Sequence, residues 1–254
     1  MLLVIDVGNT NITLGVYEND VLSLTARLAT AAGTTSDEYA VSIKNILSLH
    51  GKDYRNIEDC IISSVVPAVS SALCKAVTLL CDIVPMRVGP GIKTGLNIKI
   101  DNPAQLGADL AAGAVGAVNE YTLPCVVIDM GTASTISVID KNGAFLGGVI
   151  AAGLRLTLKA LTENTAQLPS IDITAPDKVI GTNTADCMRS GLIYGTASML
   201  DGLIDRITAE LGEIPTVVAT GGLSKDVISF CRNEIIYNEN LLLDGLREIY
   251  ELNK

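Results

Sequence analysis

One short pattern occurs twice in this chain of 254 residues, and it limits the fold more than any other feature. The first copy is an apolar run, Leu2 to Ile5, followed by Asp6-Val7-Gly8; the second is Cys125 to Ile128 followed by Asp129-Met130-Gly131. Small polar residues and a second β-branched run follow each glycine, which is typical of a hairpin with a tight glycine turn. The copies lie too far apart for a solenoid repeat. They predict two similar domains that each open with the same hairpin.

Strands and helices alternate after both hairpins, so the sequence predicts an α/β fold with mixed sheets. The expected elements are a helix after the capping box Thr35-x-x-Glu38, a strand from Cys60 to Val66, helices with apolar faces over Leu154–Leu161 and Met199–Leu211, and a strand from Thr216 to Thr220. We place a boundary near residue 120, which gives an N-terminal domain at 1–119 and a C-terminal domain at 120–254. Because no Gly/Ser-rich linker separates the halves, we expect them to pack closely, with a cleft between them.

The balance of charge excludes some classes of function. The formal net charge is −10 and no Lys/Arg cluster interrupts it, so a nucleic-acid interface lacks its electrostatic footprint. Asp6 ends the N-terminal apolar run, which therefore does not have the form of a signal peptide, and no apolar run reaches the ~18 residues of a membrane span. We expect a cytoplasmic protein that binds neither nucleic acid nor membrane.

The six cysteines and the single histidine also limit the chemistry. The cysteines form no C-x-x-C pair, and we expect them to be reduced core residues rather than metal ligands or disulfide partners. His50 precedes Gly51 near the predicted end of a helix, which favours a capping or surface role. One histidine supports neither a His-based zinc cluster nor a Ser-His-Asp triad.

The loop from Asp6 to Thr13 has the composition of a phosphate-binding loop. Gly8 permits a backbone shape that other residues resist and lets a phosphate reach main-chain N–H groups, while Asn9 and the two threonines add side-chain donors. A carboxylate repels phosphate unless a divalent cation lies between them, so we assign Asp6 to Mg²⁺, through water. Residues 129–135 repeat this chemistry, and two such loops would grip a polyphosphate from both sides.

A late glycine turn adds to the nucleotide interpretation. Gly221-Gly222 follows the strand expected at Thr216–Thr220, and in this context such a turn would lie flat against an adenine ring. The plain alternative is a duplicated turn that binds nothing, since a single D-x-G turn often only reverses the chain. No G-x-x-x-x-G-K-[ST] is present, which excludes a P-loop kinase, and no G-x-G-x-x-G follows a strand as a Rossmann dehydrogenase requires.

This set of loops resembles the superfamily of acetate kinase, sugar kinases, heat-shock chaperones and actin, whose duplicated domains have an RNase H-like, actin-like ATPase fold. Within it the chain resembles the type III pantothenate kinases essentially from end to end. The matching segments are Asp6 to Asn11, Gly89 to Asn97, Asn102 to Asp109, Asp129 to Ala133, Gly147 to Ile150, Gly181 to Thr184, Ala219 to Leu223 and Leu243 to Leu246. The resemblance implies the ATP-dependent conversion of pantothenate to 4′-phosphopantothenate, the first step of coenzyme A biosynthesis.

The resemblance also implies roles for single residues. ATP would be bound by Asp6, Val7, Gly8, Asn9, Thr10, Asn11, Ile12 and Thr13, together with Thr132. Asp109 would be the general base that takes the proton of the pantothenate hydroxyl, and Asp129 would hold the K⁺ or NH₄⁺ that such enzymes require. The acceptor site would be formed by Ile100, Gly107, Ala108, Asp109 and Leu110, with Thr184 reaching it from the partner subunit of a homodimer. The helix over Met199–Leu211 would belong to the dimer interface.

Three positions depart from the family pattern. Leu110 stands where the family usually has the arginine that pairs with the pantothenate carboxylate, Ile100 replaces a tyrosine, and Ala152 replaces a proline. The loss of a charge-assisted hydrogen bond costs about 1.5–3 kcal/mol. The first two changes lie at the acceptor site, whereas the nucleotide loops are intact.

These departures leave alternatives beside a pantothenate kinase. One is a degenerate member that binds ATP and acts on another hydroxyl substrate, and another is a nucleotide-binding regulator. The intact Asp109 favours an enzyme, because a regulator has no chemical need for a carboxylate there. Asp109 could instead serve only as the cap of the helix expected over Leu110–Val118, and this structural role is compatible with a catalytic one. A sugar kinase or polyphosphatase of the same superfamily lacks the support of the family-specific segments.

Overall fold

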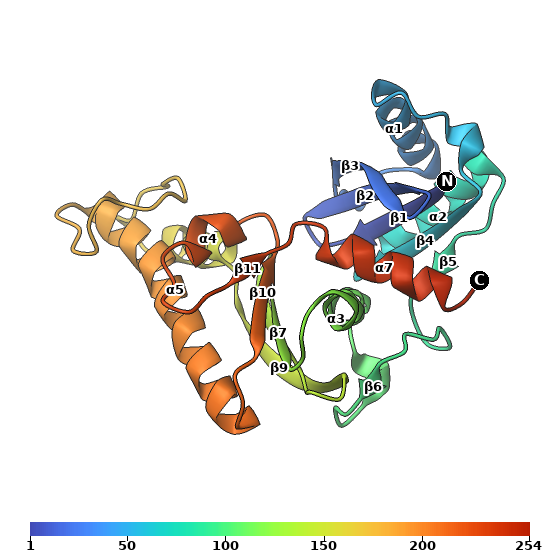
Figure 1. Ribbon diagram of the computed structural model, residues 1–254. Helices are drawn as coiled ribbons and strands as arrows, with labels where there is room; N and C mark the ends of the chain where they lie inside the picture. Colours follow the sequence, from blue (N-terminus) through green and yellow to red (C-terminus); the bar gives the residue numbers. More distant parts are fainter. The chain divides into compact units, whose positions relative to one another are not determined.

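The computed structural model describes residues 1–254, and the chain forms two compact units (Figure 1). The first unit contains Met1–Leu96, Asn102–Asn119 and Leu241–Lys254. The second contains Asn97–Asp101 and Glu120–Asn240. Each unit is built on one mixed sheet, and the predicted α/β class with mixed sheets is confirmed.

The first unit has a five-stranded sheet in the order β3-β2-β1-β4-β5. Its elements are β1 (Leu2–Val7), β2 (Asn11–Glu18), β3 (Val21–Ala29), α1 (Ser36–Leu49), a 3₁₀ turn (Tyr54–Asn56), β4 (Asp59–Ser64), α2 (Pro67–Cys81), β5 (Met86–Arg87), a second 3₁₀ turn (Pro103–Gln105), α3 (Ala108–Glu120) and α7 (Leu241–Glu251). Strands β1, β2 and β3 pair antiparallel, whereas β4 pairs parallel with β1 and β5 pairs parallel with β4.

The second unit has a six-stranded sheet in the order β11-β10-β7-β8-β9-β6. Its elements are β6 (Asn97–Ile98), β7 (Cys125–Met130), β8 (Ala133–Ile139), β9 (Ala144–Ala152), α4 (Leu154–Glu163), α5 (Thr184–Leu211), β10 (Thr216–Thr220), α6 (Ser224–Ile228) and β11 (Ile236–Tyr237). Apart from β6, the strand order and directions repeat those of the first sheet, with β7, β8, β9, β10 and β11 in the places of β1 to β5. The hairpin pattern therefore marks a duplicated topology.

The alternation of β1 explains how the first unit is layered. Leu3, Ile5 and Val7 point to one face, where they pack in a core with residues of α1 and α2. Val4 points to the other face and belongs to a separate core with residues of α3 and α7. Strand β1 is therefore buried on both sides, which accounts for its continuous apolar sequence.

Helix α7 lies against β1 and β4 although it ends the chain (Figure 1). A Cβ added at Gly245 would overlap the carbonyl oxygen of Ala112, and one at Gly116 would overlap that of Leu241. Glycine at these positions lets α3 and α7 cross at backbone contact, which places both helices on the same face of the sheet.

This packing differs from the expected boundaries of 1–119 and 120–254. The chain changes units at Asn119/Glu120, but Leu241–Lys254 returns to the first unit because the apolar face of α7 fits the Val4 side of its sheet. The segment Asn97–Asp101 joins the second unit because β6 pairs with β9. Both differences arise from contacts between residues far apart in the sequence.

Most of the expected elements form close to the predicted positions. The capping box of Thr35 and Glu38 starts α1, whose C-cap is the exposed His50. Strand β4 ends at Ser64, and Pro67 takes the first turn of α2, where proline is favoured. The half-buried stripe at Met199, Leu203 and Ile207 flanks the more deeply buried Leu200 and Ile204 of α5, which ends at the αL residue Gly212.

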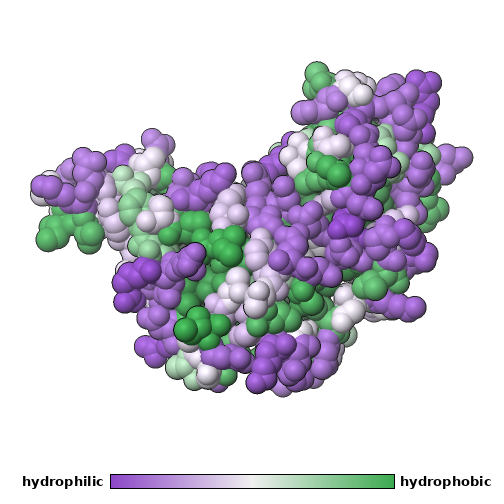
Figure 2. Space-filling view, viewed as in Figure 1, coloured by the Kyte–Doolittle hydropathy of each residue, from purple (hydrophilic) through white to green (hydrophobic).

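Side-chain polarity is mixed on the molecular surface. Figure 2 shows hydrophilic side chains over most of the face in view, with smaller hydrophobic areas between them. No helix combines the length and the apolar character that crossing a bilayer requires.

Candidate functional site

The first predicted phosphate loop is the turn between β1 and β2. The N–H of Gly8 donates to the carbonyl of Asn11 at 3.0 Å and closes the hairpin, as the sequence predicts. The loop occupies the carboxyl end of β1, beside the carboxyl end of the parallel strand β4. In this position its main-chain groups border the edge of the sheet where ligands of α/β folds are commonly bound.

Asp6 lies on a polar row at this edge. Strand register pairs Asp6 with Thr13 of β2 and with Ser63 of β4, so the three side chains share the face of the sheet that carries Val4. The Oδ1 atom of Asp6 and the hydroxyl of the fully buried Ser63 are both shielded from solvent. A half-buried carboxylate next to a phosphate loop fits the assignment to Mg²⁺ through water, because the ion offsets its charge against the phosphates.

Thr30 holds the first loop from the side of β3 and was not predicted from the sequence. Its hydroxyl donates to the carbonyl of Gly8 at 2.7 Å, and its N–H donates to the carbonyl of Thr10 at 2.9 Å. Thr30 follows the last residue of β3 and is half-buried. A single threonine after an exposed strand gives no local signal, although its place after the third strand of the repeat could have drawn attention to it.

The second predicted loop has the same construction with one residue fewer. The N–H of Gly131 donates to the carbonyl of Ala133 at 3.0 Å and closes the turn between β7 and β8. Thr132 lies in this turn and is exposed. Its carbonyl accepts the N–H of Gly153 at 3.1 Å, just as the carbonyl of Thr10 accepts the N–H of Thr30. The two nucleotide-loop candidates are therefore equivalent parts of the duplicated units.

Asp129 is enclosed by the ends of three neighbouring strands. Register pairs it with Thr135 of β8 and with Thr220 of β10. Gly221 follows with φ of +94°, and a Cβ there would lie 2.8 Å from Oδ1 of Asp129 and 2.7 Å from the carbonyl oxygen of Met130. The glycine turn after β10 thus packs directly on the Asp129 carboxylate. A carboxylate among threonine and main-chain oxygens offers the hard oxygen donors that suit a monovalent cation.

Asp109 lies in the first turn of α3, where the helix dipole favours a negative charge. Its Oδ1 accepts a hydrogen bond from the N–H of Leu110 at 2.8 Å. This bond orients the carboxylate and engages Oδ1 rather than Oδ2. A Cβ at Gly107 would lie 2.5 Å from Oδ1 of Asp109, so glycine at this position makes room for the carboxylate. Gly107, Ala108, Asp109 and Leu110 are all half-buried, and all four belong to the first unit.

The remaining predicted acceptor residues belong to the second unit. Half-buried Ile100 follows β6, and its Cγ2 lies 3.7 Å from the position of a Cβ at Gly147. Thr184 is the first residue of α5, behind the N-cap Asn183, whose side chain accepts the N–H of Asp186 at 2.9 Å. Thr184 is exposed at this helix end. Both residues therefore have accessible side chains within their own unit.

The cysteines take no part in these sites. All six are free thiols, but the expectation that all of them are core residues is wrong, since Cys187, near the start of α5, is exposed. Burial raises the pKa of Cys60 well above its usual value and that of Cys125 to about 12. A thiol with such a pKa stays protonated near neutral pH and is a poor nucleophile. No group of three His, Cys, Asp or Glu side chains is arranged to hold a metal ion, so a bound cation would need main-chain, water or phosphate oxygens as well.

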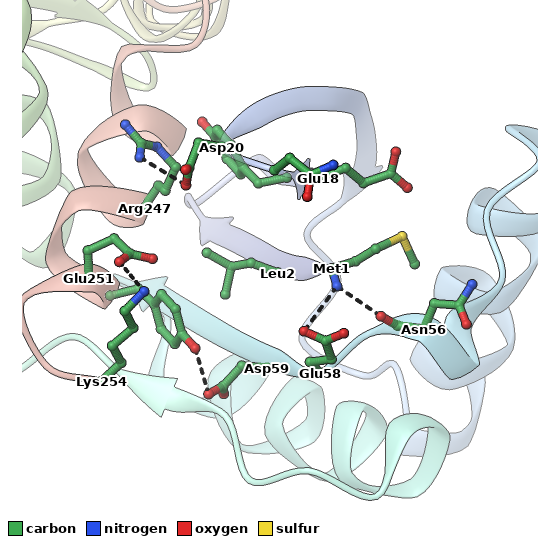
Figure 3. Close-up of a pocket in the computed structure, with 13 residues that line it drawn as sticks. Met1, Leu2, Glu18, Asp20, Asn56, Glu58, Asp59, Arg247, Glu251 and Lys254 are labelled. Atoms are coloured by element: carbon green, nitrogen blue, oxygen red, sulfur yellow. Dashed lines mark hydrogen bonds and ion pairs between the residues drawn. The ribbon is translucent and has the colours of Figure 1, made fainter.

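A pocket of about 460 Å³ lies at the opposite end of β1 from the phosphate loop (Figure 3). Its charged and polar groups pair with one another: the Met1 amine with Glu58, Arg247 with Asp20, Lys254 with Glu251, and the Tyr250 hydroxyl with Asp59. Burial and then the hydrogen bond to Asp59 raise the pKa of Tyr250 to about 12, so its phenol remains the donor. None of the predicted site residues lines this pocket.

Comparisons with known proteins agree with this architecture. A family model described as type III pantothenate kinase matches residues 2–206. The type III pantothenate kinase of Halalkalibacterium halodurans is 43% identical over 253 residues, and the match covers 100% of each chain. The enzyme of the same name from Geobacillus sp. is 42% identical over 253 residues, covering 100% of this chain and 98% of the relative.

Solved structures with lower identity share the fold. Component A of the (R)-2-hydroxyglutaryl-CoA dehydratase of Acidaminococcus fermentans superposes with a TM-score of 0.59 at 17% identity, over 100% of this chain and 99% of that one. An activator of the 2-hydroxyisocaproyl-CoA dehydratase of Clostridium difficile, solved with bound ADPNP, gives 0.56 at 14% identity, over 99% and 95%. These likenesses confirm the predicted two-domain, actin-like ATPase fold. The family model over residues 2–206 and the full-length relatives at 42–43% identity establish that this chain belongs to the type III pantothenate kinase family.

Proposed function

We propose that this protein transfers the γ-phosphoryl group of ATP to the hydroxyl of pantothenate, giving 4′-phosphopantothenate and ADP, the first step of coenzyme A biosynthesis. The observation that carries the proposal is identity of 40–43% along the full chain with relatives named type III pantothenate kinase. The duplicated phosphate loops and the retained Asp109 supply the parts that such a reaction needs.

In the proposed reaction the pantothenate hydroxyl oxygen attacks the γ-phosphorus. The bond from the γ-phosphorus to the bridging oxygen breaks, ADP leaves with the electron pair, and the hydroxyl proton passes to Asp109. The bond from the Leu110 N–H to Oδ1 fixes the carboxylate of Asp109, so that Oδ2 is the oxygen that accepts the proton. Late in the transfer the hydroxyl is strongly acidic, and an ordinary carboxylate suffices as base.

The phosphates of ATP are assigned to the two hairpin loops. Residues 6–13 would offer main-chain N–H groups with the side chains of Asn9, Thr10 and Thr13, and Thr132 would contribute from the second loop. Asp6 would hold Mg²⁺ through water, and the ion would neutralise charge on the phosphate oxygens. Asp129 would hold K⁺ or NH₄⁺, supported by its position among Thr135, Thr220 and the Gly221 turn.

The proposal includes a homodimer in the cytoplasm. Thr184, exposed at the start of α5, would complete the acceptor site of the partner subunit, and the half-buried stripe of α5 would contribute to the interface. Six free cysteines suit a reducing compartment. A monomeric mass by light scattering would refute the dimer.

A second candidate function rests on the side chain that follows Asp109. The half-buried Leu110 cannot pair with a carboxylate, and Ile100 lacks a hydroxyl, so an enzyme that accepts another alcohol, or a nucleotide-binding regulator, is the alternative. It is less well supported, because Asp109 and both phosphate loops are retained and the full-length relatives carry the kinase name.

The experiment measures ADP release with ATP, Mg²⁺ and K⁺, with and without pantothenate, for the wild type and for Asp109→Asn. We expect pantothenate-dependent ADP in the wild type and a loss of about 10²- to 10⁴-fold in the variant, because the amide cannot take the proton. ATP binding should persist in Asp109→Asn. If the wild type binds ATP but pantothenate does not increase its ADP release, the result would favour the second candidate function.

A further inference from the structure

Thr30 makes two hydrogen bonds to alternate carbonyl groups of the first loop. Its hydroxyl donates to Gly8 at 2.7 Å and its N–H donates to Thr10 at 2.9 Å. Gly8 in turn donates its N–H to Asn11 across the hairpin. One residue outside the loop thereby fixes two of the peptide planes within it.

The orientation of a carbonyl determines the orientation of the next N–H. In a trans peptide the C=O and the N–H point in opposite directions, so the Gly8 carbonyl and the Asn9 N–H form one rigid unit. Because Thr30 draws the carbonyls of Gly8 and Thr10 toward β3, the N–H groups of Asn9 and Asn11 are directed away from β3. Main-chain N–H groups that a turn aims in one direction form a site for an anion.

The second loop supplies an internal comparison. Gly153 follows β9 as Thr30 follows β3, and its N–H bonds the carbonyl of Thr132 at 3.1 Å. A Cβ at Gly153 would lie 2.5 Å from the carbonyl oxygen of Gly131 and would overlap that of Thr132. The shorter second loop is therefore held by close backbone packing, whereas the Thr30 hydroxyl adds a side-chain hydrogen bond to the first loop.

The first loop is one residue longer than the second, and this difference explains why the Thr30 hydroxyl is needed to fix its backbone. The first turn is closed by a bond between residues 8 and 11, whereas the second is closed between residues 131 and 133. The extra residue adds backbone freedom, and glycine at position 8 resists rotation of the adjoining peptide less than any other residue. Without the bond from Thr30, the Gly8–Asn9 peptide can turn and point its carbonyl oxygen toward the phosphates.

We propose that Thr30 is a positioning residue for ATP, and that its hydroxyl holds the Gly8–Asn9 peptide with its N–H toward the nucleotide phosphates. This inference rests on the proposed function of the loop. Thr30 acts through the loop backbone and on the nucleotide alone, so its loss weakens the interaction with ATP while the interaction with pantothenate is kept.

The test compares Thr30→Val, which keeps the shape and the N–H but removes the hydroxyl, with Thr30→Ser, which keeps the hydroxyl. The matched control is Thr25→Val, an exposed threonine opposite Gly15 on β3, the strand that Thr30 follows. The KM for ATP and the KM for pantothenate are measured by ADP release. Binding of MgADP is measured by calorimetry without an acceptor.

We expect Thr30→Val to raise the KM for ATP and the Kd for MgADP by about threefold to tenfold, the effect of one lost hydrogen bond. The KM for pantothenate should stay within twofold of wild type, Thr30→Ser should restore nucleotide affinity, and Thr25→Val should change neither constant. If Thr30→Val melts far below wild type, Thr30→Ala serves as the second variant without the hydroxyl.

Nucleotide constants that are unchanged in Thr30→Val, or equal increases of both KM values with no rescue by serine, would overturn the inference. The calorimetry separates this failure from a failure of the proposed function. If the wild type does not turn over pantothenate, the Kd for MgADP still reports whether Thr30 positions the loop.

Discussion

The contact between Gly221 and Asp129 leads to a prediction that joins stability to cation use. In Gly221→Ala the new Cβ would lie 2.8 Å from Oδ1 of Asp129, against 3.4 Å for the shortest ordinary contact, so the carboxylate oxygen must move by about 0.6 Å. The backbone oxygen of Met130 would lie 2.7 Å from the same Cβ, so the added methyl group would be too close to two oxygen atoms at once. The substitution therefore displaces the group assigned to the monovalent cation.

The cost of this substitution has two parts. An alanine with φ of +94° carries a strain of about 1–2 kcal/mol, and overpacking against backbone adds about 1–3 kcal/mol. The matched control is Gly212→Ala at the end of α5, where φ is +73° and nothing lies within 4 Å of the added Cβ. Both variants share the strain, and only Gly221→Ala disturbs Asp129.

The assays are urea unfolding and ADP release over a series of K⁺ concentrations. We expect Gly221→Ala to lose about 2–5 kcal/mol of stability, to need more K⁺ for half-maximal rate and to lose at least about tenfold in kcat, since displacements of this size misplace reacting groups. Gly212→Ala should lose about 1–2 kcal/mol with an unchanged K⁺ response. Equal stabilities and equal K⁺ responses in the two variants would refute the reasoning.

Two further predictions concern the first unit and the acceptor site. Gly245→Ala should destabilise the protein by about 1–3 kcal/mol, because the new Cβ overlaps the Ala112 carbonyl at the crossing of α3 and α7. This cost exceeds the gain from the better helix propensity of alanine. A rise in the urea midpoint of unfolding would contradict this packing. Leu110→Arg combined with Ile100→Tyr should raise pantothenate turnover by about tenfold, because a carboxylate gains a charge-assisted partner; kcat/KM for pantothenate equal to that of wild type would show that these positions do not limit the acceptor.

Local patterns predicted the parts of the fold that local contacts determine. The two hairpins, the capping box of Thr35 and Glu38, and strand β10 follow from residue spacing and turn chemistry. The return of α7 to the first sheet and the pairing of β6 with β9 could not be predicted in the same way. Both depend on partners more than 40 residues away, and nothing near Gly245 or Asn97 identifies those partners.

The candidate site shows the same division. The sequence and the family resemblance pointed directly to Asp6, Gly8 and Asp129, because a carboxylate or a glycine at the end of a strand is typical of cation and phosphate sites. Thr30 does not, because a threonine at the end of a strand is common and its role exists only through the folded loop. The comparison of equivalent positions in the two units, Thr30 and Gly153, is what makes the difference visible.

The placement of α7 sets an order of events during synthesis. Residues 1–96 leave the ribosome first, yet the Val4 side of their sheet has no cover from α7 until residues 241–251 have been made. The second unit draws nearly all its residues from one uninterrupted stretch, Glu120–Asn240, and has its whole sheet available earlier. The half of the molecule that is translated first is therefore the half that is completed last, and until then its uncovered apolar face needs protection from aggregation.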